Sequence, residues 1–228
     1  MGPLDGSIVA VALPDMGRSL HLSFTASMWV QAVYLLVMAA SLIPLGRLAD
    51  RHGRVRFYLS GIVLFTLGSL FSALSMNAAW LMGSRALQGA GAALLVATST
   101  AIVTAVFPPD ERGRALGINV MAVYLGLSVG PPLGGFLTDH FGWPSIFLIN
   151  LPIGIAVAGV GYLLLPRRER GDDHAERLDL PGTALWSLAL VCLLVPLTFA
   201  SEWAWTSPRT LALLGLSLIH ISEPTSPY

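Results

Sequence analysis

Two ionisable residues lie inside apolar stretches of the sequence, where a charge is costly. Asp5 comes just before the run IVAVALP, and Arg85 lies in LMGSRALQGAGAAL. A charge at the centre of a membrane-spanning helix costs roughly 2.5–3.5 kcal/mol on insertion scales, so such residues are rare and usually functional. Arginine stays charged at physiological pH and cannot itself carry a proton, whereas a carboxylate can. We therefore expect Asp5 and Arg85 to lie close together and Asp5 to exchange a proton, with a static ion pair as the alternative.

The composition indicates that a membrane surrounds these charges. Of the 228 residues, 54% are hydrophobic and 11% are charged, whereas soluble domains carry about 25% charged residues. Apolar runs of about 20 residues recur, which is long enough to cross a bilayer as helices. We predict an all-α polytopic membrane protein. The net charge of zero gives no indication of nucleic-acid binding, and the single cysteine, Cys192, allows no disulfide or thiolate metal site within the chain. We expect no cofactor and no metal.

Eight apolar segments are candidate helices, at roughly 1–16, 25–46, 57–76, 79–106, 113–138, 145–165, 179–200 and 209–221. We expect residues 1–166 to form a six-helix bundle, 167–178 a cytoplasmic linker, and 179–221 two extra helices, the second truncated. The segments 1–14 and 210–221 are too short to cross the hydrocarbon alone. The tail SEPTSPY, residues 222–228, resembles translated sequencing-adapter sequence, and we expect it to be non-native.

The arginines predict the orientation. The connections after the second, fourth and sixth segments hold ten of the thirteen arginines, namely Arg47, Arg51, Arg54, Arg56, Arg112, Arg114, Arg167, Arg168, Arg170 and Arg177. Positively charged connections stay in the cytoplasm, so we expect the N-terminus there too. Tryptophans favour membrane interfaces, and all but Trp186 fall at the opposite ends, namely Trp29, Trp80, Trp143, Trp203 and Trp205.

The stretch GRLADRHGRVR, from Gly46 to Arg56, concentrates charge between the second and third segments. We expect Gly46 and Gly53 to allow tight turns. We expect Asp50 to lie where the third helix begins, where a carboxylate can meet unpaired N–H groups. The arginines can pair with Asp50 or contact anionic lipid headgroups. As an alternative, the arginines could serve only to keep this connection in the cytoplasm, but that rule does not account for the acidic residue Asp50.

Three motifs together resemble the major facilitator superfamily. GRLADRHGRVR is similar to its cytoplasmic loop signature, Leu81–Leu94 to its fourth-helix motif, and Gly126–Gly135 (GLSVGPPLGG) to its fifth-helix antiporter motif. LDGSIVAVALP, ERGRALG and FLINLPIG resemble the fourteen-helix drug:proton antiporter family, of which this would be an N-terminal fragment. The arginine usual at the entry to the sixth helix is missing, since Trp143-Pro144-Ser145 stands there.

The resemblance implies roles for three groups of residues. It implies a conformational latch at Gly46, Asp50, Arg51, Gly53 and Arg54. It implies a fourth-helix motif at Arg85, Gln88 and Gly89, where Gln88 could bond to a ligand or to backbone. It implies a seal between bundles at the antiporter motif, namely Gly126, Gly130, Pro131, Gly134 and Gly135. Packing alone could need the same glycines, and Pro131 with Pro132 should bend the helix.

We expect a secondary active transporter, not an enzyme, that exports drug-like or amphipathic compounds in exchange for protons. Its partners would be membrane lipids, a small-molecule substrate and protons, in the inner (plasma) membrane. A metabolite or siderophore exporter is one alternative, and a non-transporting receptor is another. GLSVG also matches the G-x-S-x-G pattern of hydrolases, but that pattern needs a strand-to-helix turn around Ser128. The sequence has no phosphate-binding loop, which favours an ion gradient over ATP.

Overall fold

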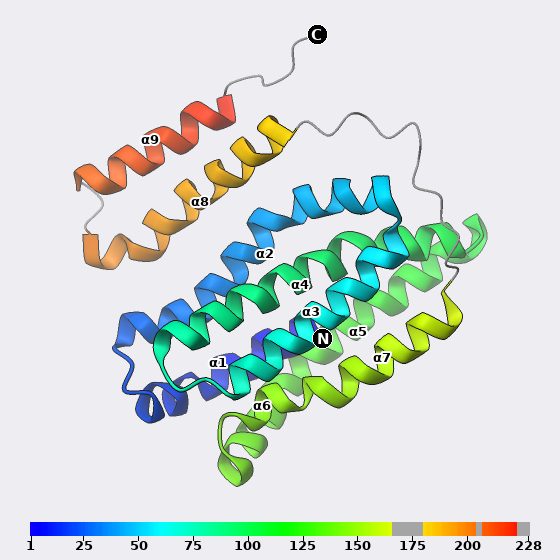
Figure 1. Ribbon diagram of the computed structural model, residues 1–228, viewed down its shortest axis with the longest axis horizontal. Coiled ribbons are helices and arrows are strands. Elements are labelled where there is room, and N and C mark those ends of the chain that lie inside the picture. The colour runs from blue at the N-terminus through cyan, green and yellow to red at the C-terminus, as the bar shows by residue number, and fades with distance from the viewer. Residues whose placement is uncertain (166–179, 204–206, 223–228) are drawn as a thin grey trace.

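The chain folds into long helices in a computed structural model that describes residues 1–165, 180–203 and 207–222 (Figure 1). The helices are α1 (Gly2–Ser19), α2 (Phe24–His52), α3 (Arg54–Ala73), α4 (Ala78–Val106), α5 (Pro109–Phe141), α6 (Ser145–Leu148), α7 (Asn150–Leu164), α8 (Leu180–Trp203) and α9 (Pro208–Ser222). The all-α membrane architecture predicted from the sequence is confirmed. The predicted linker at 167–178 lies outside the described residues, as do Trp205 and all but the first residue of the predicted tail.

Side-chain caps mark the starts of two helices. Ser23 Oγ accepts a hydrogen bond from the backbone N–H of Ala26 at 3.2 Å at the start of α2, and Asn77 Oδ1 accepts one from Trp80 at 2.9 Å at the start of α4. These side chains satisfy donors that the first helical turn leaves free. In the described part of the chain, α2, α3, α4, α5 and the α6–α7 pair are long and apolar enough to cross a membrane. The 18 residues of α1 include three charged side chains and do not meet that condition.

The charged stretch after residue 46 differs from the prediction. α2 continues to His52 and α3 begins at Arg54, so only Gly53 separates them. Gly53 has φ +104°, a backbone conformation that favours glycine. Gly46 lies inside α2, where an added Cβ would meet Ala97 of α4 at 3.5 Å. The expected turn at Gly46 was therefore wrong, because the backbone of this stretch satisfies its hydrogen bonds by remaining helical.

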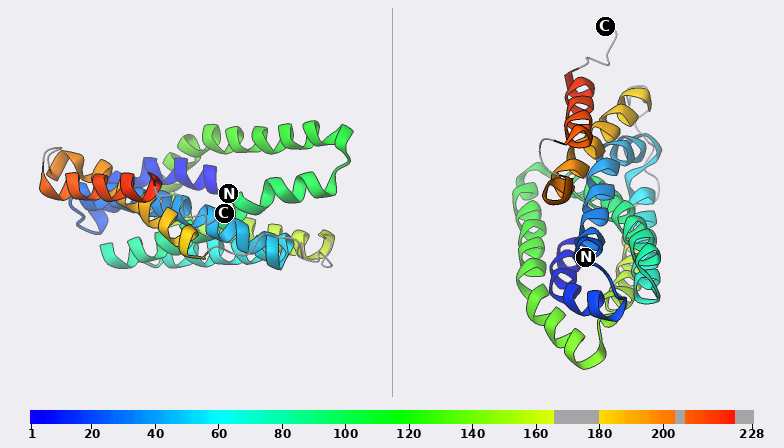
Figure 2. Two further views of the ribbon diagram at one scale, coloured as in Figure 1. Left: turned by 90° about the horizontal axis from the view of Figure 1, so that it is seen from above. Right: turned by 90° about the vertical axis from the view of Figure 1, so that its left-hand side faces the viewer.

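α4 is the central element of the bundle, because it packs closely against both α2 and α3. Glycines bring these helices together. A Cβ added to Gly91 would lie 2.5 Å from the backbone nitrogen of Phe65, and one added to Gly89 would lie 2.6 Å from the carbonyl oxygen of Tyr34. α1 packs along the C-terminal half of α5 and also contacts α2 (Figure 2).

α8 and α9 form a separate pair that packs against α2 (Figure 1). Ser187 Oγ donates to the carbonyl of Ala40 at 2.7 Å, and the rings of Trp29 and Phe199 lie 4.7 Å apart. The hairpin therefore extends the surface of the bundle next to α2 without entering its centre.

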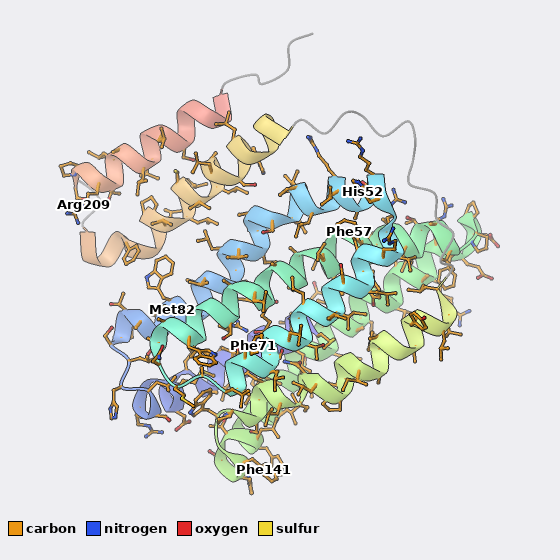
Figure 3. The ribbon with its side chains drawn as sticks, viewed as in Figure 1. His52, Phe57, Phe71, Met82, Phe141 and Arg209 are labelled. Carbon is orange, nitrogen blue, oxygen red and sulfur yellow. The ribbon has the colours of Figure 1, made fainter. Side chains whose placement is uncertain are left out.

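The connections alternate between the two ends of the bundle. The α2–α3 and α4–α5 connections lie at the same end of the bundle (Figure 1), and the helix ends beside them carry most of the arginines in the described residues. His52 and Phe57 mark this end in Figure 3, and Phe71, Met82 and Arg209 lie toward the other. The arrangement agrees with alternating membrane crossings, and the side that each end faces remains a prediction.

Candidate functional site: a buried carboxylate network

Asp5 lies in the first turns of α1 and is 1% exposed. Three side chains donate hydrogen bonds to its carboxylate. Arg85 Nη1 donates to Oδ2 at 2.6 Å, and Gln88 Nε2 and Asn150 Nδ2 donate to Oδ1 at 2.8 and 3.0 Å. An ionised carboxylate only accepts hydrogen bonds, so this set of donors fits the charged form of Asp5. α1, α4 and α7 therefore meet at one acid.

Besides Asp5 on α1, Arg85 contacts residues of α2 and α6 and Gln88 of its own helix, and none of its side chain is exposed. Its Nε donates to the carbonyl of Val30 on α2 at 3.2 Å, and Nη1 also donates to Oε1 of Gln88 at 2.5 Å. The guanidinium carbon lies 4.3 Å from the ring centre of Tyr34 and 5.8 Å from that of Phe147. The two rings face a cation, an arrangement that favours arginine over lysine. Its Nη2 has no partner in the described structure.

Gln88 connects the ion pair to α3. Besides its bond to Asp5, its Nε2 donates to Ser69 Oγ at 2.7 Å, and Ser69 donates in turn to the carbonyl of Phe65 at 3.0 Å. The sequence left two alternatives for Gln88, a ligand or the backbone. The structure shows a third arrangement, because its side-chain partners are all side chains of the network. Spacing along α4 could not show which residues of α1 and α3 would face it.

Asn150, Tyr34 and Ser69 are members of the network that sequence reasoning missed. Asn150 belongs to FLINLPIG, which served there only as a family resemblance. A polar amide inside an apolar span was the signal that could have singled it out, since buried polar groups in membranes need partners. Tyr34 and Ser69 carry no such signal, because each is common in apolar helices.

A cavity of about 840 Å³ lies beside the network, among α1, α2, α3, α4 and α5 with one residue of α7. Tyr34 lines it and also contacts Arg85, whereas Asp5 and Arg85 do not line it. The polar groups in its wall come from several helices, namely Ser7, Gln31, Tyr58, Ser99, Thr100 and Asn119. Tyr34 is therefore the structural contact between the cavity and the ion pair.

The latch residues lie at the α2–α3 junction. Asp50 is in the last turn of α2, and it accepts a hydrogen bond from Arg54 Nε at 2.6 Å. The expectation that Asp50 lies at the start of the third helix was wrong, because α3 begins four residues later. Asp50 still contacts α3, because Arg54 is the first residue of that helix and its side chain reaches back past Gly53. Arg51 is exposed on the same end.

The glycines of the antiporter motif face α1. A Cβ on Gly126 would lie 3.2 Å from the backbone nitrogen of Leu4, one on Gly134 would lie 3.1 Å from the carbonyl oxygen of Ile8, and one on Gly130 would collide with Ser7. α5 continues as one helix through Pro131 and Pro132, and Gly135 has open space around it. Three of the motif's glycines thus permit close packing of α5 on α1.

Ser128 lies within α5. The strand-to-helix turn of a hydrolase nucleophile is therefore not present around Ser128.

The sequence and the fold were both compared with those of known proteins. The sequence model described as Major Facilitator Superfamily matches residues 1–222. The fold is similar to the crystal structure of a bacterial homolog of the human lysosomal transporter Spinster, in an inward-facing and unoccupied conformation. The match has a TM-score of 0.58 at 20% identity, and covers 96% of this chain and 56% of that one.

Curated relatives include transport and resistance proteins. The chain is 38% identical over 195 residues to the riboflavin transporter RibZ of Clostridioides difficile, covering 86% of this chain and 42% of that protein. It is 41% identical over 217 residues to the multidrug resistance protein Stp of Mycobacterium tuberculosis, covering 95% and 40%. It is 36% identical over 223 residues to the tetracenomycin C resistance and export protein of Streptomyces glaucescens, covering 96% and 40%. The chain thus spans about two-fifths of the length of these relatives.

Proposed function

Because the chain belongs to the Major Facilitator Superfamily, we propose that it contains the proton-coupling half of a secondary active transporter. The full-length protein would export drug-like or amphipathic compounds in exchange for protons, in the manner of the fourteen-helix antiporters. It would sit in the inner (plasma) membrane with the arginine-rich connections in the cytoplasm. The relatives named for multidrug resistance and antibiotic export support this class of substrate.

The observation that carries the proposal is the buried carboxylate of Asp5. It is the meeting point of α1, α4 and α7, and Arg85 provides a fixed positive charge 2.6 Å away. A proton on Asp5 removes its negative charge and one of its acceptor positions, so the three donors lose part of their binding partner. Protonation would therefore loosen the contact of α1 with α4 and α7, and release of the proton would restore it.

This change gives proton binding a mechanical consequence. Arg85 stays charged throughout, so a neutral Asp5 leaves an uncompensated buried cation. The bundle can relieve that cost by admitting water or an anionic or polar group next to Arg85, whose Nη2 is without a partner in the described structure. Protons would enter from the outer side and leave to the cytoplasm during export.

The latch at the α2–α3 junction would follow the same cycle. The Asp50–Arg54 pair is exposed, so its contribution to folding is small, about 1 kcal/mol or less. A weak, exposed pair can break and form again as bundles move, which is what a latch requires. The arginines next to it, including Arg51, would contact anionic lipid headgroups.

A metabolite is the second candidate substrate, and the similarity to a protein named as a riboflavin transporter favours it. A non-transporting receptor is less favoured, because a receptor has no need of a buried acid with an exchangeable proton.

Transport into inverted vesicles that contain the full-length protein tests these candidates. A pH gradient with the vesicle interior acidic should drive accumulation of amphipathic antibiotics or dyes, and a protonophore should abolish it. Accumulation of riboflavin but of no drug-like compound would identify a metabolite exporter. Saturable binding with no gradient-driven accumulation of any compound would contradict transport and favour a receptor.

A further inference from the structure

Asn150 is unusual for a buried amide, because only one of its two polar groups makes a hydrogen bond. Its Nδ2 donates to Asp5 Oδ1 at 3.0 Å, while its carbonyl Oδ1 is buried and has no hydrogen-bond partner in the described structure. The residue is 1% exposed. A buried acceptor without a donor is costly, so a second arrangement that uses it is expected.

Protonation of Asp5 supplies the missing donor. The ionised carboxylate offers only acceptors, whereas the protonated acid carries one O–H group. The side-chain amide of asparagine presents a donor and an acceptor that exchange places when it rotates by half a turn about its terminal bond. The same residue can thus donate to the ionised acid and accept from the protonated one.

We propose that Asn150 is a positioning residue for proton coupling that follows the protonation state of Asp5. The inference rests on the proton coupling proposed above. In the ionised state Asn150 Nδ2 donates to Asp5 Oδ1, as in this structure. When a proton from water binds Oδ1, the amide rotates and its Oδ1 accepts the new O–H. No covalent bond of Asn150 changes, and loss of the proton to water reverses the rotation.

The position of Asn150 lets this change affect a whole helix. It is the first residue of α7, and Ile149 alone separates it from the end of α6 at Leu148, within the sixth span. Pro152 has no N–H group and cannot bond to the carbonyl of Leu148, so the helix is weakened at this point. A change of hydrogen bond at Asn150 therefore acts where α6 and α7 can move relative to each other.

The other groups that face Asp5 cannot perform this exchange. On α4, Arg85 is a permanent cation with donors only, and Gln88 already uses its carbonyl to accept from Arg85. The ionisable neighbours besides Arg85 are Tyr34 on α2 and the amino terminus at Met1. α3 contributes Ser69, which donates to its own helix. Among the described residues that contact Asp5, Asn150 has a side-chain acceptor without a partner.

The first test is infrared spectroscopy of the full-length protein with 13C-labelled asparagine. Difference spectra across the pH range in which Asp5 titrates should contain a side-chain carbonyl band that shifts to lower frequency upon protonation. The band should be absent from Asn150→Ser and should not shift in Asp5→Asn. A carbonyl band of Asn150 that stays constant while Asp5 titrates overturns the inference.

The second test is the pH profile of transport. In Asn150→Leu, the midpoint should move to higher pH by about one unit, since a bond to a charged acceptor is stronger than one to a neutral group. Asn150→Ser, whose hydroxyl can both donate and accept, should restore part of the shift. Thr138→Val is the matched control, because Thr138 Oγ1 is also buried without a partner but makes no contact with Asp5 in the described structure.

The two levels of the proposal fail in different ways. If Asn150→Leu folds and keeps the wild-type midpoint, the role of Asn150 is wrong while proton coupling stands. If wild-type transport needs no proton gradient, the proposed function is wrong whatever Asn150 does. If Asn150→Leu does not fold, the infrared comparison of the wild type with Asn150→Ser still decides the inference.

Discussion

At the scale of the residue, the cost of burying Asp5 and Arg85 is compensated by their mutual contact. Each is less than 2% exposed, and their closest atoms are 2.6 Å apart. Breaking a buried pair by removing one partner costs about 3–5 kcal/mol, because the other charge is left uncompensated, whereas replacing both partners is often nearly neutral. The folded state is therefore most stable when both charges are present or both are absent.

We expect Arg85→Gln to destabilise the full-length protein strongly, by about 3–5 kcal/mol, because it leaves Asp5 without its cation. Asp5→Asn combined with Arg85→Gln should recover most of this loss. Unfolding of the purified proteins in detergent, followed for both single variants and the double variant, measures the coupling. Additive losses in the double variant would contradict a direct energetic link between the two residues.

Sequence reasoning could find the two charges but not their surroundings. Asp5 and Arg85 stand out because a charge in an apolar segment is rare. Asn150, Ser69 and the partners of Gln88 could not be assigned, since each depends on which residues of another helix come within 3 Å. Such distances follow from helix packing, which one sequence does not display.

At the scale of the element, the α3–α4 contact depends on the absence of side chains. Gly91 allows α4 to approach the backbone of α3, and a Cβ there would lie 2.5 Å from the nitrogen of Phe65. Since that neighbour is backbone, it cannot give way without moving a helix. The ion pair is built on α4, so this contact also positions Arg85.

Gly91→Ala should therefore destabilise the protein by about 1–3 kcal/mol, as overpacking does in other cores. Gly83→Ala is the matched control, because Gly83 lies on the same helix and nothing comes within 4 Å of its added Cβ. Alanine should be neutral or slightly stabilising there. Thermal unfolding of both variants provides the comparison, and equal stabilities would show that α3 and α4 are not in such close contact.

The α2–α3 junction supports a different prediction. Asp50→Asn should reduce transport by the full-length protein while leaving its amount in the membrane unchanged, since the exposed pair with Arg54 contributes little to folding. Asp110→Asn serves as the control, because Asp110 is an acid in the first turn of α5 at the same end of the bundle. Wild-type transport rates in Asp50→Asn, or an equal loss in Asp110→Asn, would contradict a latch.

Helix positions were predictable, whereas some helix ends were not. Apolar runs located the helices because a membrane requires about 20 such residues. The stretch LADRH has the composition of a connection, but it continues α2, since a helix can extend into the headgroup region with its charged side chains in water. Composition therefore shows where the hydrocarbon ends, and not where the helix ends.

At the scale of the whole molecule, connections that share an end of the bundle should share a side of the membrane. We expect cysteines placed at Asn77 and His140, in a Cys192→Ser background, to react with an impermeant thiol reagent only from outside the cell. Cysteines at Arg51 and Arg112 should react only from the cytoplasm. Labelling of the first two positions from the cytoplasmic side would invert the proposed orientation and, with it, the direction assigned to proton flow.

The central claim is that Asp5 exchanges the coupling proton, and substrate-linked proton flux measures this most directly. In vesicles that contain the full-length protein, addition of substrate should release protons with the wild type and with Asp15→Asn, a control on the same helix whose acid pairs with the exposed Arg18. Asp5→Asn should bind substrate but release no protons. Undiminished substrate-linked proton release in Asp5→Asn would contradict the account and place the proton carrier at another residue.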